Sequence, residues 1–338
     1  MDSLNKEEKS NPVVSVIIPV FNVVSYLEKS VKSVCTQTYD NLEILLIDDG
    51  STDGSDKLCD SLANHDARIR VIHKKNSGIA DTRNVGLENV HGDFIVFIDS
   101  DDWVKSDMIE RLLNVLLNEN ADIVACENYF VYGDRIEKPD TSGKCVRQDS
   151  DSSLKTLLDD RKFRSRTWGR IYKASTWKGI SFPSGTTYED VSTVYKTYLK
   201  AEVIVLLDEP LYFYNQRDNS IVHSDSYKSF FNLLDARILR KKELGKLKPK
   251  FLPELKVSVI AAIIDIYREA ALSNQRLDFG EDEKLQLILS KNYGKLEKKL
   301  LSPRYRAELN LLKLSKGMFY SMENKLNSLV IHIKRMGK

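Results

Sequence analysis

Short apolar runs alternate with segments of helical spacing through the first 132 residues. Runs rich in β-branched or aromatic residues predict strands at Val13–Val20, Leu42–Ile47, Ile69–His73, Phe94–Ile98 and Ile123–Tyr132. Between them, apolar residues recur every three or four positions, which predicts helices over 24–37, 55–65, 82–90 and 105–118. Strands that alternate with helices at this spacing predict an α/β fold with a mainly parallel sheet.

The pattern is less regular after this stretch. Residues 133–153 are polar and contain many turn formers, which predicts a loop or an irregular hairpin. Beyond it we predict helices over 154–172 and 190–201 and strands at 203–207 and 211–214. From Tyr227 onward the pattern is helical almost throughout. We therefore predict a flexible or disordered segment over residues 1–12, an α/β domain over 13–224 and a helical region over 225–338.

Acidic residues follow directly on the apolar run Phe94–Ile98. They are Asp99, Asp101 and Asp102, with Ser100 between the first two. Buried carboxylates need a cation or hydrogen-bond donors to offset their desolvation. Two interpretations are open at this point. The acids could cap a helix that starts near Trp103, or they could hold a divalent ion, which typically binds through one or two carboxylates plus substrate phosphates.

Polar clusters end two further predicted strands. Asn22 follows the first strand, and Asp48-Asp49-Gly50 follows the second. Ligands of parallel sheets bind at the carboxyl ends of the strands. Because three strand ends carry such clusters, we expect one ligand site at this edge of the sheet, although Asp-Gly is also a common turn pair.

Charge is distributed unevenly along the chain. The net charge is +2, but residues 225–338 hold 24 Lys+Arg and 13 Asp+Glu, so the first 224 residues are acidic overall. A basic tail is attracted to anionic partners such as phospholipid, a lipid pyrophosphate or nucleic acid, or it is simply a solvated helical surface. The last helix has apolar residues spaced three and four apart, which is typical of packing on other helices, of a short coiled coil that joins copies of the chain, or of a membrane surface. These residues are Phe319, Met322, Leu326, Leu329, Ile333 and Met336.

Several classes of protein are disfavoured. The four cysteines form no CxxC pair and no zinc-finger spacing, which fits a reducing compartment. The polar N-terminus does not have the pattern of a signal peptide, and no window of 18 apolar residues predicts a membrane span. We therefore expect a cytoplasmic protein whose only membrane contact is peripheral, on the inner face of the cell membrane.

Six sequence blocks stand in a characteristic order. They are Val16-Ile17-Ile18-Pro19-Val20-Phe21-Asn22, Asp48-Asp49-Gly50-Ser51, Asn76-Ser77-Gly78 with Arg83-Asn84-Val85-Gly86, Gly92-Asp93-Phe94 leading to Asp99-Ser100-Asp101-Asp102, Trp168-Gly169-Arg170-Ile171-Tyr172, and Tyr188-Glu189-Asp190-Val191. With these blocks the chain resembles family 2 glycosyltransferases of the bacterial capsular, exopolysaccharide or surface-glycan type, which have the GT-A fold. The resemblance covers roughly residues 13–224 and implies a nucleotide-sugar half (13–130) and an acceptor half (131–224).

The resemblance implies a UDP-sugar donor and a Mn²⁺ or Mg²⁺ cofactor. It makes Asp101 the direct metal ligand, while Asp99 contacts the ribose, or the metal through water. By the same resemblance Asp49 accepts a hydrogen bond from uracil, and Arg83 lies near the base or phosphate, unless it forms only a surface salt bridge. The remaining residues expected at the nucleotide sugar are Pro19, Val20, Asn22, Asn76 and Ser100.

The resemblance places the chemistry on Glu189 and Asp190. It implies inversion by direct displacement, with Asp190 as the general base and Glu189 beside it at the acceptor. Trp168 and Tyr172 are either aromatic walls for the acceptor or core residues. Arg217 and His223 are candidate contacts of the acceptor or pyrophosphate. Many relatives have Asn-Lys where this chain has Gly169-Arg170, so the acceptor contacts remain open.

The expected function is transfer of a hexosyl or N-acetylhexosaminyl group to a glycan hydroxyl. We expect a lipid-linked precursor of a surface polysaccharide as the acceptor, with a protein-linked glycan or a teichoic-type polymer as the alternative, and no nucleic acid partner. The sequence disfavours two other classes of protein. A nucleotidyltransferase would need a phosphate loop rich in Gly and basic residues where Pro19-Val20-Phe21-Asn22 stands. A non-catalytic helical scaffold would not need the five acids of the two acidic blocks, Asp99, Asp101, Asp102, Glu189 and Asp190.

Overall fold

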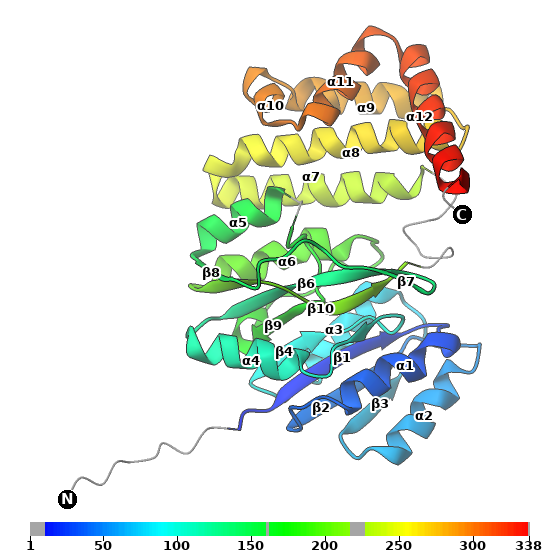
Figure 1. Ribbon diagram of the computed structural model, residues 1–338. Helices are drawn as coiled ribbons and strands as arrows, with labels where there is room; N and C mark the ends of the chain where they lie inside the picture. The colour runs from blue at the N-terminus through cyan, green and yellow to red at the C-terminus, as the bar shows by residue number, and fades with distance from the viewer. Residues whose placement is uncertain (1–10, 160–161, 217–226, 337–338) are drawn as a thin grey trace, which may run out of the picture. The chain divides into compact units, whose positions relative to one another are not determined.

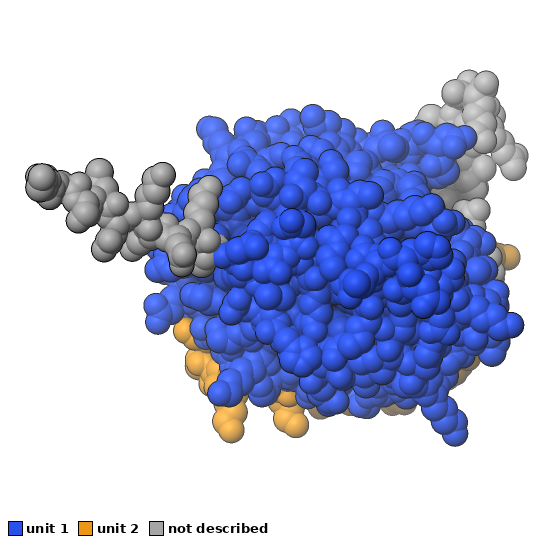
Figure 2. Space-filling view, turned by 90° about the horizontal axis from the view of Figure 1, so that it is seen from below, with its two compact units in different colours: residues 1–216 blue, residues 217–338 orange. Residues whose placement is uncertain are grey.

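The computed structural model describes residues 11–159, 162–216 and 227–336, and side chains as far as residue 326. Two compact units divide the chain between residues 216 and 217 (Figure 2). The first contains a mixed sheet flanked by helices, and the second is helical (Figure 1). Both features agree with the fold class predicted from the sequence. The boundary predicted from the sequence was residue 224.

The sheet of the first unit has ten strands. Its main path runs β3-β2-β1-β4-β9-β6-β10-β5, with β7 paired to β6 and β8 to β10. Strands β1 to β4 are parallel, whereas β9 enters antiparallel between β4 and β6. The strands are β1 (Val14–Val20), β2 (Leu42–Asp48), β3 (Ile69–His73), β4 (Phe94–Phe97), β5 (Trp103–Val104), β6 (Ile123–Tyr132), β7 (Arg135–Glu137), β8 (Cys145–Gln148), β9 (Arg170–Lys173) and β10 (Ile204–Asn215).

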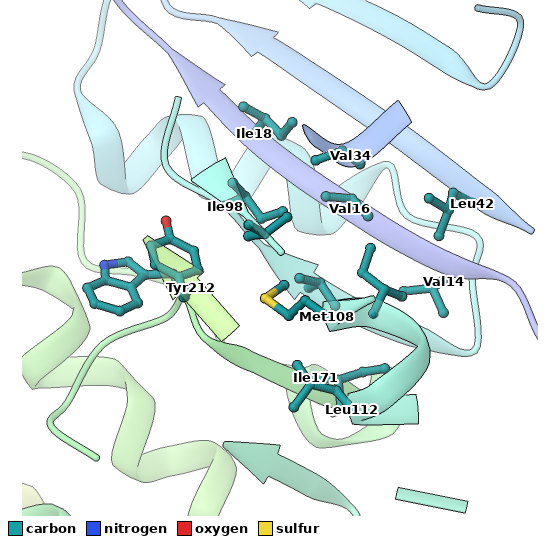
Figure 3. Close-up of a cluster of buried hydrophobic side chains, with 14 of the residues drawn as sticks. Val14, Val16, Ile18, Val34, Leu42, Ile98, Met108, Leu112, Ile171 and Tyr212 are labelled. Carbon is teal, nitrogen blue, oxygen red and sulfur yellow. The ribbon is translucent and has the colours of Figure 1, made fainter. Parts of the chain in front are cut away.

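Helices cover the sheet because successive strand side chains point to opposite faces. On one face, Val14, Val16 and Ile18 pack in a core with α1, α2 and α4 (Figure 3). On the other face, α3 lies against Ile17, so close that a Cβ on Gly86 would be 2.5 Å from the Ile17 Cγ2 atom. The helices of this unit are α1 (Val24–Cys35), α2 (Ser55–His65), α3 (Ile79–Glu88), α4 (Met108–Asn118), α5 (Ser150–Asp159) and α6 (Glu189–Lys200), with a 3₁₀ turn η1 (Ala174–Trp177).

Two predictions about the second half of this unit are wrong. The helix predicted over 154–172 ends at Asp159, and residues 170–173 form β9 instead. Pairing with β4 and β6 on both sides outweighs the helical spacing of this segment. The strands predicted at 203–207 and 211–214 are one strand, β10, whose register shifts around Pro210 because proline has no N–H to donate to the ladder.

The second unit is built around α8. This helix is apolar on most of its circumference because it contacts α7, α9, α10, α11 and α12. On α12, Phe319 is fully buried, whereas Leu326 is 48% exposed, so the described part of this helix packs on one side. Its later apolar residues lie outside the described side chains. The elements are α7 (Ser229–Leu247), η3 (Pro249–Phe251), α8 (Leu252–Leu272), α9 (Phe279–Asn292), α10 (Lys295–Leu300), α11 (Pro303–Leu314) and α12 (Lys316–Met336).

No described helix is both long enough and apolar enough to cross a membrane.

Candidate active site

The polar clusters predicted at strand ends meet at one edge of the sheet. Strands β1, β2, β3 and β4 run parallel, so the segments that follow them emerge on the same side. Because β9 is antiparallel, the segment that precedes it, ending at Trp168 and Gly169, reaches the same edge. The site is therefore built from loops at the carboxyl ends of parallel strands, as expected for such a sheet.

Asn22 joins the end of β1 to the loop after β2. Its backbone has a φ of 49°, and its Oδ1 accepts a hydrogen bond from the Thr52 N–H at 2.9 Å. Its own N–H donates to the Ser51 Oγ at 3.1 Å. The side chains of Pro19 and Val20 are buried inside the strand, so only their backbone groups could reach a ligand at this edge.

Asp49 organises the loop after β3. Its carboxylate is buried and accepts hydrogen bonds from the backbone N–H groups of Ser77 and Gly78, both at 2.9 Å, and from the Lys74 ammonium. These contacts hold the exposed Asn76 at the same edge. The neighbouring Gly50 has a φ of +71°, and a Cβ there would be 3.0 Å from the Asn76 nitrogen, so the close approach of the two loops requires glycine.

Asp48 faces away from this loop and pairs with His73. The Asp48 Oδ2 lies 2.9 Å from the His73 Nδ1, and the Asp60 Oδ1 lies 3.1 Å from the His73 Nε2. Burial opposes ionisation of Asp48, but hydrogen bonds from His73 and Ser51 outweigh it and lower the pKa of the carboxyl. The same contacts with Asp48 and Asp60 raise the pKa of His73. This cluster stabilises the end of β2 beside the site.

The acidic segment after β4 does not cap a helix. Residues Trp103–Val104 form β5, and α4 begins only at Met108, so the capping interpretation is wrong. Asp102 is buried and accepts hydrogen bonds from the Tyr212 hydroxyl at 2.7 Å and from the Asn215 N–H at 2.8 Å. The Tyr212 hydroxyl in turn accepts the Asp99 N–H at 3.1 Å. These contacts fasten the segment to β10.

The same segment carries two partly accessible carboxylates, those of Asp99 and Asp101. Asp99 and Asp101 are both half-buried, whereas Ser100 is buried. Burial and the nearby charges of Asp101 and Asp99 raise the pKa of Asp102, and a cation would relieve this repulsion. Within the described residues no three His, Cys, Asp or Glu side chains form a metal-binding group. Two neighbouring carboxylates fit an ion that takes its other ligands from a substrate and water.

Arg83 connects this segment to the predicted catalytic pair. The side chain, on α3, is only 6% exposed, so the surface salt bridge considered for it is wrong. Its Nη2 donates to the Asp99 Oδ1 at 2.8 Å, and its Nη1 pairs with the Glu189 Oε1. Burial opposes the charge of the guanidinium, but Asp99 and Glu189 outweigh it and raise the pKa of Arg83. One buried cation thus brings two predicted site acids together.

Glu189 and Asp190 start helix α6. The preceding Tyr188 has a φ of 61°, a conformation that costs free energy for a residue with a side chain and that is common at functional sites. Glu189 is buried against Arg83, whereas Asp190 is half-buried and accepts its hydrogen bond from the Val191 N–H at 2.7 Å. Burial and the charge of Glu189 raise the pKa of Asp190 to about 7, with Arg83 opposing the shift. A carboxylate with this pKa suits proton transfer near neutral pH.

The aromatic walls predicted for the acceptor belong to the core. Tyr172 is fully buried and packs edge-on against Phe97 with ring centroids 6.2 Å apart, so its role as a wall is wrong. Trp168 is 7% exposed and stacks on Tyr212 at 4.3 Å. Aromatic identity alone did not distinguish the two roles. Arg217 and His223, the two candidate pyrophosphate contacts, lie outside the described residues.

Sequence reasoning missed three residues that hold the site together. Tyr212 and Asn215 fasten the acidic segment, and Arg170 holds the loop before β9. Tyr212 stands in an apolar run that reads only as strand, and Asn215 ends it without a motif. The only sequence signal for Arg170 was that this chain has Gly169-Arg170 where many relatives have Asn-Lys.

Comparisons with known proteins agree on one family. The model of "Glycosyl transferase family 2" matches residues 15–187. The chain is 33% identical over 258 residues to glycosyltransferase GlyG of Streptococcus pneumoniae, an alignment that covers 73% of this chain and 84% of GlyG. It is 32% identical over 314 residues to glycosyltransferase GlyA of the same organism, covering 85% of this chain. The alignment covers only 45% of GlyA, so the chain spans less than half the length of that relative.

Solved structures share the fold at low sequence identity. The structure of residues 1–349 of S. aureus TarS in complex with UDP matches with a TM-score of 0.66 and 18% identity, covering 96% of this chain and 92% of TarS 1–349. The mannosyltransferase PcManGT of Pyrobaculum calidifontis, in complex with GDP-Man and Mn²⁺, matches with a TM-score of 0.55 and 14% identity, covering 94% of this chain and 88% of that one. At this identity the likeness concerns the fold alone.

Proposed function

Because the chain belongs to glycosyl transferase family 2 and has the GT-A fold with a helical region after it, we propose that it transfers a sugar from a UDP-sugar to a hydroxyl group of a glycan, with inversion at the anomeric carbon. The observation that carries this proposal is the Arg83 bridge. It joins Asp99 of the acidic segment to Glu189 beside Asp190, so a donor held at the first segment would lie close to a base at the second.

The proposed donor site is the edge formed by the loops after β1, β2 and β3. Asn22, Asp49 and Asn76 would meet the nucleoside, with backbone groups of Pro19 and Val20 beneath it. Both Asp49 oxygens already accept backbone hydrogen bonds, so a uracil N–H would have to share one of them. The UDP complex of TarS supports uridine as the nucleoside.

Asp101 and Asp99 are the proposed ligands of Mn²⁺ or Mg²⁺, with Ser100 between them at the donor. The Mn²⁺ complex of PcManGT supports metal use. A bound divalent ion supplies Lewis-acid stabilisation of the charge that develops on the leaving diphosphate. Asp102 has no such role in this proposal, because Tyr212 and Asn215 occupy its carboxylate.

Asp190 is the proposed general base. It removes the proton from the acceptor hydroxyl, whose oxygen attacks the anomeric carbon while the bond from that carbon to the diphosphate breaks and UDP leaves. Glu189 is held by Arg83, and its proximity to Asp190 raises the pKa of Asp190. The two acids thus have different roles.

A lipid-linked surface polysaccharide precursor is the proposed acceptor. The basic surplus of residues 225–338 supports it, because such a region is attracted to the anionic inner face of a membrane. A protein-linked glycan or a teichoic-type polymer is the alternative acceptor and needs no such attraction.

The test is UDP release from a panel of UDP-sugars with Mn²⁺, Mg²⁺ or EDTA. The panel holds UDP-glucose, UDP-galactose, their N-acetylamino forms and UDP-glucuronate. We expect metal-dependent release from one donor, reduced roughly 100-fold or more by Asp190→Asn, since a general base contributes at least that factor. Asp101→Ala should abolish this metal-dependent release of UDP.

Asp235→Asn is the matched control, because this aspartate is exposed on α7 in the other unit. It should leave UDP release unchanged. Hydrolysis without acceptor can be slow, so calorimetry of UDP binding with and without Mn²⁺ accompanies the panel. Absence of metal-dependent UDP binding by the wild-type chain would show that the proposed function is wrong.

A further inference from the structure

Arg170 uses every hydrogen-bond donor of its guanidinium inside the protein. The side chain, on β9, is buried. Its Nε donates to the Tyr198 hydroxyl at 3.1 Å, its Nη1 to the carbonyls of Arg166 and Trp168 at 2.5 and 3.2 Å, and its Nη2 to those of Phe163 and Arg164 at 3.1 and 2.6 Å. A guanidinium has five N–H donors, and all five have acceptors here.

Four of these acceptors are backbone carbonyls of one loop, residues 163–168. The loop has no ladder of its own; it begins at a φ of 50° at Phe163, and the Gly169 that follows it has a φ of 66°. The rigid fork of an arginine therefore replaces the backbone hydrogen bonds that secondary structure would supply. A lysine has three donors on a single nitrogen and cannot satisfy this set.

Two side chains of the loop, Trp168 and Arg166, connect it to neighbouring strands. Trp168 stacks on Tyr212 with an interplanar angle of 11° and ring centroids 4.3 Å apart. The Arg166 guanidinium lies 4.4 Å from the centroid of the Trp168 ring, and its Nη1 donates to the Asn128 Oδ1 at 2.8 Å. The loop thus fixes the plane of the Tyr212 ring.

Tyr212 completes the connection to the acidic segment. Its hydroxyl accepts the Asp99 N–H and donates to the Asp102 Oδ2. We infer that Arg170 is a positioning residue that acts through the loop 163–168, Trp168 and Tyr212 to hold Asp99–Asp102 in place. Arg170 itself touches only protein groups in this chain of contacts. Its consequence for donor binding rests on the proposed function, whereas the mechanical connection does not.

Hydrogen–deuterium exchange of the ligand-free chain tests the connection. In Arg170→Lys we expect the exchange rate to rise roughly three- to tenfold in segments 97–102 and 211–216 as well as in 163–168. This is the rise expected when local stability falls by the contribution of one hydrogen bond. The Asp99 and Asn215 amides, both hydrogen-bonded to this cluster, are the reporters. A rise confined to residues 163–168 would overturn the inference.

Arg68→Lys is the matched control. Arg68 also donates to a backbone carbonyl, that of Cys35 at 2.7 Å, but it precedes β3 at the opposite edge of the sheet. It should leave exchange in all three segments unchanged. If Arg170→Lys does not fold, Trp168→Leu breaks the same connection at the stacking contact. Unchanged exchange at 97–102 in that variant would equally overturn the inference.

A double-mutant cycle separates positioning from general loosening. Tyr212→Phe removes the hydroxyl, so adding Arg170→Lys to it should cause no further rise at 97–102, whereas additive rises would contradict the connection. With UDP and Mn²⁺ as the probe, Arg170→Lys should raise the Kd roughly three- to tenfold and Arg68→Lys should not. A wild-type chain that binds no UDP would refute the proposed function but leave the exchange result to decide this inference.

Discussion

Asp190 combines a raised proton affinity with access to solvent. Burial and the charge of Glu189 both favour its protonated form, whereas the charge of Arg83 and the hydrogen bond from the Val191 N–H favour the ionised one. A base of this kind is half ionised near neutral pH, where it can still accept a proton from a hydroxyl. The balance between one buried cation and two adjacent acids therefore sets the pH range of the proposed reaction.

We predict that kcat/KM for UDP release falls as pH drops below about 7, by roughly tenfold per pH unit, because protonated Asp190 cannot act as a base. The raised pKa fixes the sign: activity is present above it and lost below it. Initial rates from pH 5 to pH 9 measure this fall on the acid side of the pH profile. A rate that stays constant down to pH 5, with circular dichroism showing a folded chain throughout, would contradict this role.

Individual residues of the candidate site could be proposed from the sequence where a motif contained them. Asp49, Asp99, Asp101, Glu189 and Asp190 all carry polar chemistry next to predicted strand or helix ends. The pairing of Arg83 with Glu189 was not predictable, because the two residues are 106 positions apart and meet only through the fold. The carbonyl acceptors of Arg170 have no sequence signal, since every residue type supplies the same carbonyl.

Helix α3 carries Arg83 and depends on a glycine for its distance from the sheet. Gly86 lies on the face of α3 that packs against β1, where any side chain would meet Ile17. The helix thus approaches the sheet closely enough for Arg83 to reach both Asp99 and Glu189. Packing at one position controls the geometry of the site at another.

We predict that Gly86→Ala lowers the free energy of unfolding by about 1–2 kcal/mol, because overpacking outweighs the gain in helix propensity. Urea unfolding followed by circular dichroism measures it. Gly280→Ala in α9 is the matched control, since its new Cβ would lie 3.5 Å from the Asp278 Oδ1, an ordinary van der Waals contact. That variant should be neutral or slightly more stable. Equal effects of the two substitutions would refute the packing argument.

Most elements of the first unit followed from hydrophobic periodicity. Strands β3 and β6 and helix α2 have the predicted bounds, because each is a continuous apolar or amphipathic segment between turn formers. Strand β9 was missed because it is four residues long and its sequence, RIYK, alternates for too short a stretch. This segment is a strand because it pairs with β4 on one side and β6 on the other.

The whole chain carries opposite charge in its two parts. We predict that it binds vesicles containing phosphatidylglycerol at low salt, and that binding weakens as NaCl screens the attraction. The exposed lysines Lys295, Lys298 and Lys299 of α10 flank the exposed Leu296 and Leu300, so this helix offers both charge and apolar contact. Replacing the three lysines by glutamine should weaken binding at least about tenfold, measured by vesicle sedimentation.

Lys57, Lys138 and Lys144, which are exposed in the first unit, provide the matched triple replacement. That variant should bind vesicles like the wild type. If the wild type does not bind the vesicles, or if the two triple replacements weaken vesicle binding equally, α10 has no specific role in membrane binding. The proposal of a lipid-linked acceptor then loses its support. The sequence indicated the charge surplus directly, but not which helix presents it, because exposure depends on the packing around α8.

The insertion of β9 between β4 and β6 also determines the order in which the chain can fold during synthesis. When the ribosome has made residues 13–130, β4 is paired with β1 on one side only, and its other edge stays open until residues 170–173 emerge. An open edge of apolar residues invites pairing with other chains. The two halves expected at 13–130 and 131–224 therefore cannot mature one after the other. The nascent chain must keep its first half soluble while about forty further residues are added.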